Sequence, residues 1–562
     1  MKSKDEKEYE KRVKARVLTL KQFLEKGDKK INIVNKEDAV NFEESFRKIR
    51  FDKDGDPILE TVDGRIRSLA LVIEQVDHRD KMKSAISLQQ IQEGYFNRIE
   101  GNFNHFYKIM LENNVSPHQV ANVIAYGKQS IDHLDEVIIP ILKDLEKYWE
   151  LVAESGYLHL EDDYDSIKAV FGGDLFPSNE ENIASKCGIY TDTIILPCPF
   201  IRSRHMFDVW NKEQRVYYLL KHALNILQYK ELALTELDKP IIVILPDKEM
   251  MDEFAYENIS KLGEIDALYH AQKVFDRKFE SIEELIEFGK SLDTIEKVTN
   301  EIKDQKRVLF DTEFKDSLEL QIKNQMEGDS AKAMRTDNPG IIVSMMGLGR
   351  MSVCNELLLK ASKVGGVPLI DAPTSWEYFK WKLEYDSERT YPDKDYSKLH
   401  IVKGLNGLDS SNLQWIGKIP PKGLIELRKN GAINEIREIL LKGIDELVNA
   451  NQFDFTSTSH KVFNNLNFAF NQHQENIKKL TNKKWKLAGK DFGSWLVMGS
   501  VEIASACTGN MIFGLPSAIL SQVLDAPKLK DLPKTVENIK QTEREKEQLK
   551  KSPLGLMFKY NK

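Results

Sequence analysis

The spacing of apolar side chains predicts a helical region over residues 1–155. Apolar residues recur at helical intervals in the segment 86–103. Ser116 directly precedes Pro117. This pair predicts the start of a helix, because Ser caps helix N-termini and Pro fits the first helical position. A further helix is predicted over 131–152.

The middle of the chain, residues 156–403, alternates short apolar runs with helical patterns. Runs that are apolar at nearly every position are typical of parallel strands buried on both faces. We therefore predict a central open sheet, mainly parallel, with helices between its strands. The predicted strands are 191–196, 240–245, 340–345 and 366–370, with a fifth at 399–402. The predicted helices between them are 215–232, 248–262 and 351–364, and 263–335 is predicted to be a charged helical insertion.

The C-terminal region, residues 404–562, is again helical in pattern and holds an unusual apolar segment. Residues 492–524 contain one charged side chain, Glu502, in 33 positions. Gly509 and Pro516 divide the segment into two pieces, each shorter than the roughly 20 residues that a bilayer-spanning helix needs. A buried helical hairpin is therefore expected. The alternative is a hairpin that inserts into a membrane, and Glu502 counts against it because a carboxylate is costly at membrane depth.

These patterns predict an α and α/β multidomain protein that is mostly helical. The composition agrees, since 41% hydrophobic and 30% charged residues in a chain of 562 exclude a disordered or fibrous protein. The four cysteines lie far apart without a CxxC pair, so we expect neither a disulfide framework nor a metal site. Residues 1–30 lack the apolar run of a secretory signal. We therefore expect a soluble, cytoplasmic protein.

Charge is distributed unevenly along the chain. The net charge is −7, yet residues 1–30 carry eleven basic and six acidic side chains, and residues 528–562 carry ten and five. The body between these basic ends is therefore acidic, and the chain has no specific nucleic-acid signature. The basic ends interleave acids at helical spacing, which favours solvated helices over segments that bind anionic lipid. Helical surfaces could instead serve contacts with other protein chains.

A ligand site is expected at one edge of the predicted sheet. Open α/β sheets bind ligands where the carboxyl ends of their parallel strands meet. Eight residues that follow the predicted strands are therefore candidates for one common cleft. They are Arg202, Arg204, His205, Asp247, Gly347, Gly349, Arg350 and Asp371.

Two groups of these residues suggest an anionic ligand. Gly347 and Gly349 follow the predicted strand 340–345, and Asp371 ends the next one, which is the context of a dinucleotide fingerprint. Bulky Met351 and the lack of a third glycine favour an ordinary strand–helix turn instead.

The second group is Arg202, Arg204 and His205, whose side chains suit phosphate or carboxylate capture. A solvated start of a helix is the alternative explanation for this cluster.

Two further patterns favour core packing over function. His222 lies on an apolar helix, where a lone histidine is expected to be a hydrogen-bonded core residue. Residues 374–382 interleave aromatic and lysine side chains, a composition that could stack single-stranded bases. The helical spacing of Trp376, Phe379 and Leu383 argues instead for a helix that faces the core.

The sequence therefore predicts a protein that acts through a nucleotide or other anionic ligand at the carboxyl edge of a central sheet. One alternative is a helical scaffold without catalysis. Another is a membrane-acting effector that uses residues 492–524. Neither a catalytic residue nor a cofactor can be assigned from the sequence.

Overall fold

The computed structural model describes most of the first 389 residues and short parts of the remainder. The described residues form two compact units, Met1–Ile91 with Val152–Asp162 as unit 1 and the rest of the chain as unit 2. The three regions predicted from the sequence stay a prediction. The described ranges are 4–25, 36–127, 131–172, 183–188, 191–247, 253–310, 316–328, 336–370, 372–389 and 421–431, with residues 461, 464, 468, 486, 487, 490 and 491.

Unit 1 is a small helical assembly around an apolar core. Its core includes Val17, Leu20 and Ile66, all fully buried. The Asp63 carboxylate accepts a hydrogen bond from the Ile66 amide and so caps the helix that follows. Its elements are α1 (Lys4–Glu25), α2 (Lys36–Arg47), η1 (Leu59–Thr61) and α3 (Gly64–Ala85).

The helices predicted for 86–152 are confirmed. Ser116 and Gln119 form a capping box, in which each side chain accepts from the other residue's amide, and Pro117 occupies the first turn. These helices are α4 (Leu88–Glu112), α5 (Pro117–Ala125) and α6 (Asp132–Glu161).

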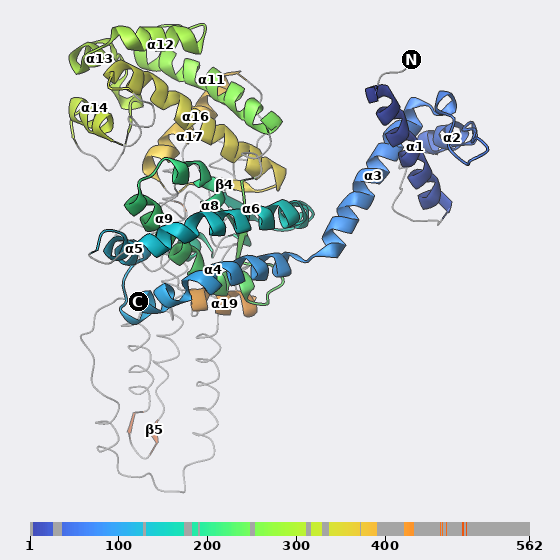
Figure 1. The fold of residues 1–562 in the computed structure, drawn as a ribbon, viewed down its shortest axis with the longest axis horizontal. Coiled ribbons are helices and arrows are strands. Elements are labelled where there is room, and N and C mark those ends of the chain that lie inside the picture. Colours follow the sequence, from blue (N-terminus) through green and yellow to red (C-terminus); the bar gives the residue numbers. More distant parts are fainter. Residues whose placement is uncertain are drawn as a thin grey trace. The chain divides into compact units, whose positions relative to one another are not determined.

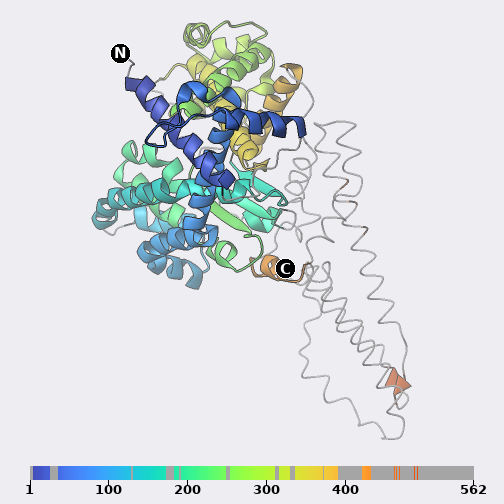
Figure 2. The ribbon, with the colours of Figure 1, turned by 90° about the vertical axis from the view of Figure 1, so that its right-hand side faces the viewer.

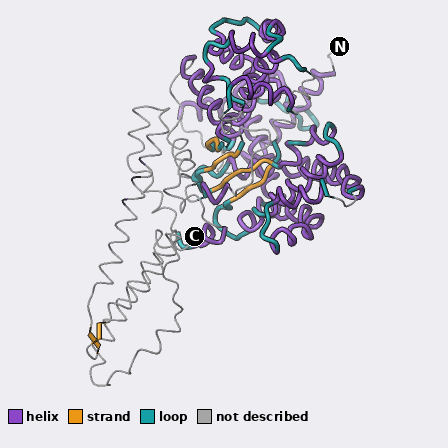
Figure 3. The backbone as a smooth tube through the Cα atoms, turned by 90° about the vertical axis from the view of Figure 1, so that its left-hand side faces the viewer, coloured by secondary structure: helices purple, strands orange, loops and turns teal. Residues whose placement is uncertain are grey.

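A four-stranded parallel sheet lies at the centre of unit 2, enclosed by helices (Figure 2, Figure 3). Its order is β3-β2-β1-β4, so the chain adds two strands on one side of β1 and then returns to the other side. All but one of its residues are buried. The strands are β1 (Lys168–Phe171), β2 (Thr193–Pro197), β3 (Ile242–Leu245) and β4 (Val367–Leu369). A two-residue pair, β5 (Lys486–Leu487) with β6 (Lys490–Asp491), is antiparallel.

Three of the predicted strands are confirmed and one is wrong. The runs at 191–196, 240–245 and 366–370 are β2, β3 and β4, whereas the segment 340–345 is helical. The predicted strand 399–402 and the apolar segment 492–524 lie outside the described residues.

The segment 340–345 belongs to α16 (Pro339–Lys363), the long helix of unit 2. The Asn338 side chain accepts from the Ile341 amide, and Pro339 stands at the first helical position, which together start a helix before the apolar run. A run that is apolar at nearly every position fits a buried helix as well as a buried strand, so periodicity alone could not distinguish them. The N-cap Asn338 and Pro339 are the sequence features that indicate a helix here.

The described residues of the charged insertion predicted for 263–335 are mainly helical, and its helices gather around α16 (Figure 1). They surround an apolar core that includes Leu285, Val298 and Ile322. The helices are α11 (Glu253–Phe275), α12 (Ile282–Ser291), α13 (Ile295–Glu301), η4 (Gln305–Arg307) and α14 (Leu318–Glu327).

The remaining helices connect the strands or cover the sheet. The core-facing helix predicted around Trp376 and Phe379 is confirmed, since both side chains are buried. These helices are α7 (Ile183–Cys187), α8 (Pro199–Arg202), η2 (Arg204–Asp208), α9 (Lys212–Leu227), α10 (Lys230–Leu234), α17 (Pro373–Arg389) and α19 (Pro421–Lys429).

Helix α19 is fastened near the amino end of β2. The guanidinium of Arg428 donates to the Asp192 carboxylate (3.0 Å) and to the Gly188 carbonyl (3.1 Å). Leu424 is buried, and a side chain on Gly188 would lie only 3.0 Å from it. This contact lies near the amino end of β2, opposite the carboxyl edge where the ligand site is expected.

Among the described helices, α16 has the length and apolar composition of a membrane span. Half of its apolar window is buried within the protein, and it carries Glu356 and Lys360 as buried charges. These properties are those of a core helix.

The helical state of 347–349 gives a stability test. Gly349 is exposed within α16, and an added Cβ would meet nothing within 4 Å. Gly349→Ala is therefore expected to raise the free energy of unfolding by about 0.5–1 kcal/mol, because Ala favours a helix interior over Gly. Urea unfolding of both proteins measures the change. The contrasting variant is Gly263→Ala, whose Cβ would lie 3.0 Å from Ser352 Cα across the α11–α16 contact and should destabilise the protein. A destabilised Gly349→Ala protein would contradict a helix at this position.

Candidate functional site

Four charged side chains are buried together behind the carboxyl ends of β2 and β3. Arg202 ends α8, which follows β2, and Asp247 lies two residues after β3. Arg202 Nη1 lies 2.5 Å from Asp247 Oδ2 and 2.7 Å from Glu356 Oε1. Lys360 Nζ lies 2.5 Å from Asp247 Oδ1 and also pairs with Glu356. We name this closed ring of two cations and two anions the charge quartet.

The charge quartet is electrically balanced inside the core. Its side chains are between 4% and 8% exposed. Burial alone would raise the pKa of Asp247, but the charges of Lys360 and Arg202 lower it below the usual value. An incoming anion would have to displace a carboxylate from Arg202. The ion pairs of the charge quartet instead connect α16 to the segments that follow β2 and β3. Ligand capture by Arg202 itself stays a prediction.

Arg204 and His205 lie on the turn that follows Arg202. Arg204 pairs with Glu146 (2.8 Å) and with Asp208 (3.0 Å). Partial burial and the charge of Arg202 lower the pKa of His205, so the ring is neutral at pH 7. Both residues belong to η2, which follows α8 and the carboxyl end of β2 in the chain.

Gly347 and Gly349 lie inside α16 and not in a strand–helix turn. The expected context of a dinucleotide fingerprint is therefore wrong for this pair. The reason is the helix start at Asn338, which leaves both glycines within continuous helix. Gly347 faces His270 on α11, where an added Cβ would lie 3.3 Å from the ring.

Arg350 lies near the carboxyl end of β4. Its Nη1 donates to Ser375 Oγ at 3.0 Å, and Ser375 stands in the first turn of α17, six residues after Leu369. Its Nη2 donates to the Phe310 carbonyl at 3.4 Å. Asp371, between β4 and α17, lies outside the described residues. The structure thus places Arg350 at the expected edge but on a helix rather than a loop.

The first strand of the sheet was missed from the sequence, and with it a glycine pair. Gly172 follows β1 directly, and its amide donates to the Leu369 carbonyl at 3.0 Å, which joins the ends of β1 and β4. A Cβ at this position would lie 3.0 Å from a methyl group of Leu357 on α16. The signal was present in the short run 167–171 followed by Gly172 and Gly173, but Lys168 interrupts the run. Lys168 lies within the sheet and its amine is bonded to the Asp163 carbonyl.

Ser203 and His222 form a buried contact that opposes base catalysis. Ser203 Oγ donates to the Pro199 carbonyl at 2.5 Å, so at 3.2 Å it accepts from His222 Nε2. A general base would have to accept the proton of the serine instead. Burial, with the charge of Lys221, lowers the pKa of His222 to about 3. The expectation of a hydrogen-bonded core histidine is confirmed.

The remaining reactive groups of the described residues are potential metal ligands and thiols. Within the described residues, no group of three or more His, Cys, Asp or Glu side chains is arranged to hold a metal ion. Cys187, Cys198 and Cys354 are buried free thiols. Burial raises the pKa of Cys354 to about 12 and raises that of Cys198 as well.

Removing one charge of the charge quartet is expected to lower the free energy of unfolding strongly. Asp247→Asn leaves Arg202 and Lys360 with one anion between them, and breaking a buried pair typically costs about 3–5 kcal/mol. Because the folded pKa of Asp247 is depressed, its contribution is present above the unfolded pKa and is lost as pH falls through the folded value. Chemical denaturation at pH 7 measures the change. Asp238→Asn, at an exposed carboxylate before β3, is the control. Equal stabilities of the two variants would contradict a stabilising role of the charge quartet.

His222 predicts an acid sensitivity with a defined sign. Its folded pKa of about 3 lies below the unfolded value near 6.5. The unfolded chain therefore binds a proton that the native state refuses, and stability falls by up to about 1.4 kcal/mol per pH unit for this group below pH 6.5. Unfolding curves between pH 7 and 5 should show a shallower decline for His222→Asn than for the wild type. Identical slopes would mean that native His222 titrates normally.

Comparison with known proteins adds no functional assignment. No protein-family profile matches the chain, and searches of curated proteins and of solved structures found no significant match. The candidate site is therefore defined by the geometry of this chain's own residues.

Proposed function

We propose that unit 2 binds a small anionic ligand at the carboxyl edge of its sheet, between β1 and β4. The observation that carries the proposal is the strand order β3-β2-β1-β4 with all strands parallel. The chain continues from β1 to β2 on one side and returns with β4 on the other side of β1, and in open α/β folds ligands bind in the crevice at such a reversal of strand order.

The residues at this reversal suit close approach of a ligand. Gly172 follows β1 directly, with Leu357 of α16 packed where its side chain would lie, and Gly173 is the next residue in the sequence. Glycines after the first strand allow a ligand to lie directly against the backbone. In this proposal the sequence pair Gly172–Gly173 serves the ligand in place of Gly347 and Gly349.

The charge at the edge favours an anion. Arg350 contacts Ser375 in the first turn of α17, so a guanidinium and a helix N-terminus lie at the same end of β4. Helix N-termini favour negative groups, and a guanidinium can form two parallel bonds to a phosphate or carboxylate. Nucleotides carry phosphate groups and belong to this class of ligand. In this proposal Arg350 contacts the ligand, whereas the charge quartet only holds α16 against the strand ends.

A helical scaffold that binds other proteins remains the second proposal. Val123 on α5 and Tyr126, which directly follows this helix, are 70% and 55% exposed. Exposed apolar and aromatic side chains on one helix face favour protein contacts. The proposal of a membrane-acting segment concerns residues 492–524, outside the described part of the chain.

Ligand-induced stabilisation tests the first proposal. ATP, NAD and inorganic phosphate are each added at millimolar concentration, and the melting temperature of the full chain is recorded. A ligand at 100 times its Kd stabilises the native state by about 2.7 kcal/mol. We expect at least one probe to raise the melting temperature, and Arg350→Gln to reduce that rise relative to its own ligand-free value.

Arg277→Gln is the matched control for Arg350→Gln. Arg277 is half exposed on the helical insertion, and its guanidinium pairs with Glu284 rather than with a residue at the sheet edge. The ligand-induced rise should be unchanged in this variant. A failure of all three probes to shift the wild type contradicts an anionic ligand. An equal ligand-induced rise of the melting temperature in both variants would show that the ligand does not bind at Arg350 beside β4.

A further inference from the structure

An irregular segment of the helical insertion crosses the helices that surround α16. Residues 303–310, which we name the strap, contain η4 and follow α13. At its beginning, the amides of Lys303 and Asp304 donate to the Val274 carbonyl near the end of α11 (2.8 and 3.1 Å). Val308 is buried in the core of the insertion, and Phe310 packs against that core.

Three carbonyls of the strap accept hydrogen bonds from three different helices. His270 Nε2 on α11 donates to the Arg307 carbonyl (3.1 Å). The Tyr378 hydroxyl on α17 donates to the Leu309 carbonyl (3.2 Å). Arg350 Nη2 on α16 donates to the Phe310 carbonyl (3.4 Å). Side chains thus provide the bonds that regular secondary structure would provide elsewhere.

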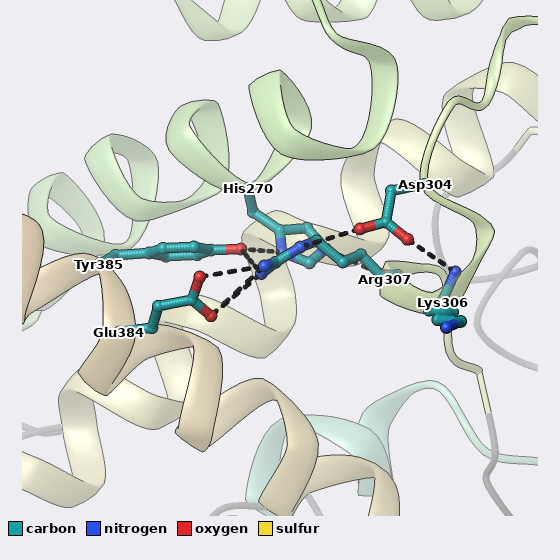
Figure 4. A network of polar contacts seen from close by, with 6 residues as sticks. All are labelled: His270, Asp304, Lys306, Arg307, Glu384 and Tyr385. Carbon is teal, nitrogen blue, oxygen red and sulfur yellow. Dashed lines mark hydrogen bonds and ion pairs between the residues drawn. The ribbon is translucent and has the colours of Figure 1, made fainter. Parts of the chain in front are cut away.

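The Arg307 end of the strap is held by a closed network (Figure 4). His270 Nε2 faces a carbonyl and must carry the proton, so Nδ1 accepts from the Tyr385 hydroxyl at 2.8 Å. The Tyr385 oxygen in turn accepts from Arg307 Nη1 at 3.0 Å. The same guanidinium pairs with Glu384 at 3.0 Å. Burial, with the charge of Arg307, lowers the pKa of His270 to about 3, so the ring stays neutral and the network keeps its proton directions.

The Phe310 end of the strap is held more weakly. The bond from Arg350 to the Phe310 carbonyl is long at 3.4 Å and has a neutral acceptor. The same guanidinium reaches Ser375 in the first turn of α17, at the edge where the ligand is proposed. Arg350 is therefore shared between the strap and the site.

We propose that the strap is a ligand-responsive latch whose Phe310 end is released when an anion at the β1–β4 edge draws the Arg350 guanidinium away. This inference rests on the proposed function. The bond to the Phe310 carbonyl involves one charge, whereas a bond to an anion adds the attraction between two opposite charges and can be bidentate, so the anion wins the competition with the carbonyl. The Arg307 network has no member at the edge and stays closed. Binding would thereby change the surface of the helical insertion.

A fluorine label at Phe310 in the full chain reports release directly. Phe310 is replaced by 4-trifluoromethylphenylalanine, and the 19F resonance is recorded without ligand and with ATP or inorganic phosphate. We expect the ligand to convert a resonance typical of a packed ring into one typical of a solvated ring. A label at Phe288, which packs against the same core and contacts Phe275 and Phe279, is the control, and its resonance should not change.

Variants separate the latch from the ligand site. In the absence of ligand, Arg350→Gln should give the solvated Phe310 resonance as the major species, and Arg350→Lys should restore part of the packed one. Tyr378→Phe removes the Leu309 bond but leaves Arg350 in place, so the response to ATP should persist. Circular dichroism and melting curves verify that each variant is folded.

The outcomes distinguish failure of the latch from failure of the proposed function. If ATP or phosphate raises the melting temperature but the Phe310 resonance stays packed, the latch is wrong and ligand binding stands. If no probe raises the melting temperature, the proposed function fails. An unmoved Phe310 resonance in folded Arg350→Gln overturns the latch whether or not a ligand binds.

Discussion

Four charged side chains that are buried together must neutralise one another, and this requirement fixes how α16 lies on the sheet. An unpaired ion in the core costs several kcal/mol, so Glu356 and Lys360 have to meet Arg202 and Asp247. Sliding α16 by one turn would separate them. The charge quartet therefore sets the register between a long apolar helix and the ends of β2 and β3, which dispersion contacts alone define less sharply.

The other contacts of α16 follow from that register. Leu357 packs against Gly172 at the end of β1, and Ser352 lies where Gly263 allows α11 to approach closely. Arg350 then reaches the first turn of α17. One helix thus positions the sheet edge, the insertion and the strap, so a ligand that changes the hydrogen bonds of Arg350 acts on a part already in contact with all three.

The sequence predicted those features that depend on neighbours along the chain. The capping pair Ser116–Pro117 and the strands β2 to β4 are of this kind, because each is a local pattern. The charge quartet was only partly foreseen. Arg202 and Asp247 were assigned to one edge, but Glu356 is 154 positions from Arg202, and no local pattern links them. The segment 340–345 was predicted to be a strand because a run that is apolar at nearly every position lacks the periodicity that marks a helix. Strand β1 was missed because Lys168 interrupts its apolar run. A charged residue within a buried strand is rare unless it is paired or hydrogen-bonded.

The buried thiols give the core an internal reporter of its own opening. Cys354 lies on the same helix as Glu356 and Lys360, and burial raises its pKa to about 12. The thiolate is the form that alkylating reagents attack, so in the closed protein Cys354 is both covered and almost fully protonated. Its rate of alkylation near neutral pH is then governed by how often α16 separates from its neighbours. Labelling kinetics at this single sulfur would therefore measure the free energy of that separation, one local opening among those that any folded chain undergoes.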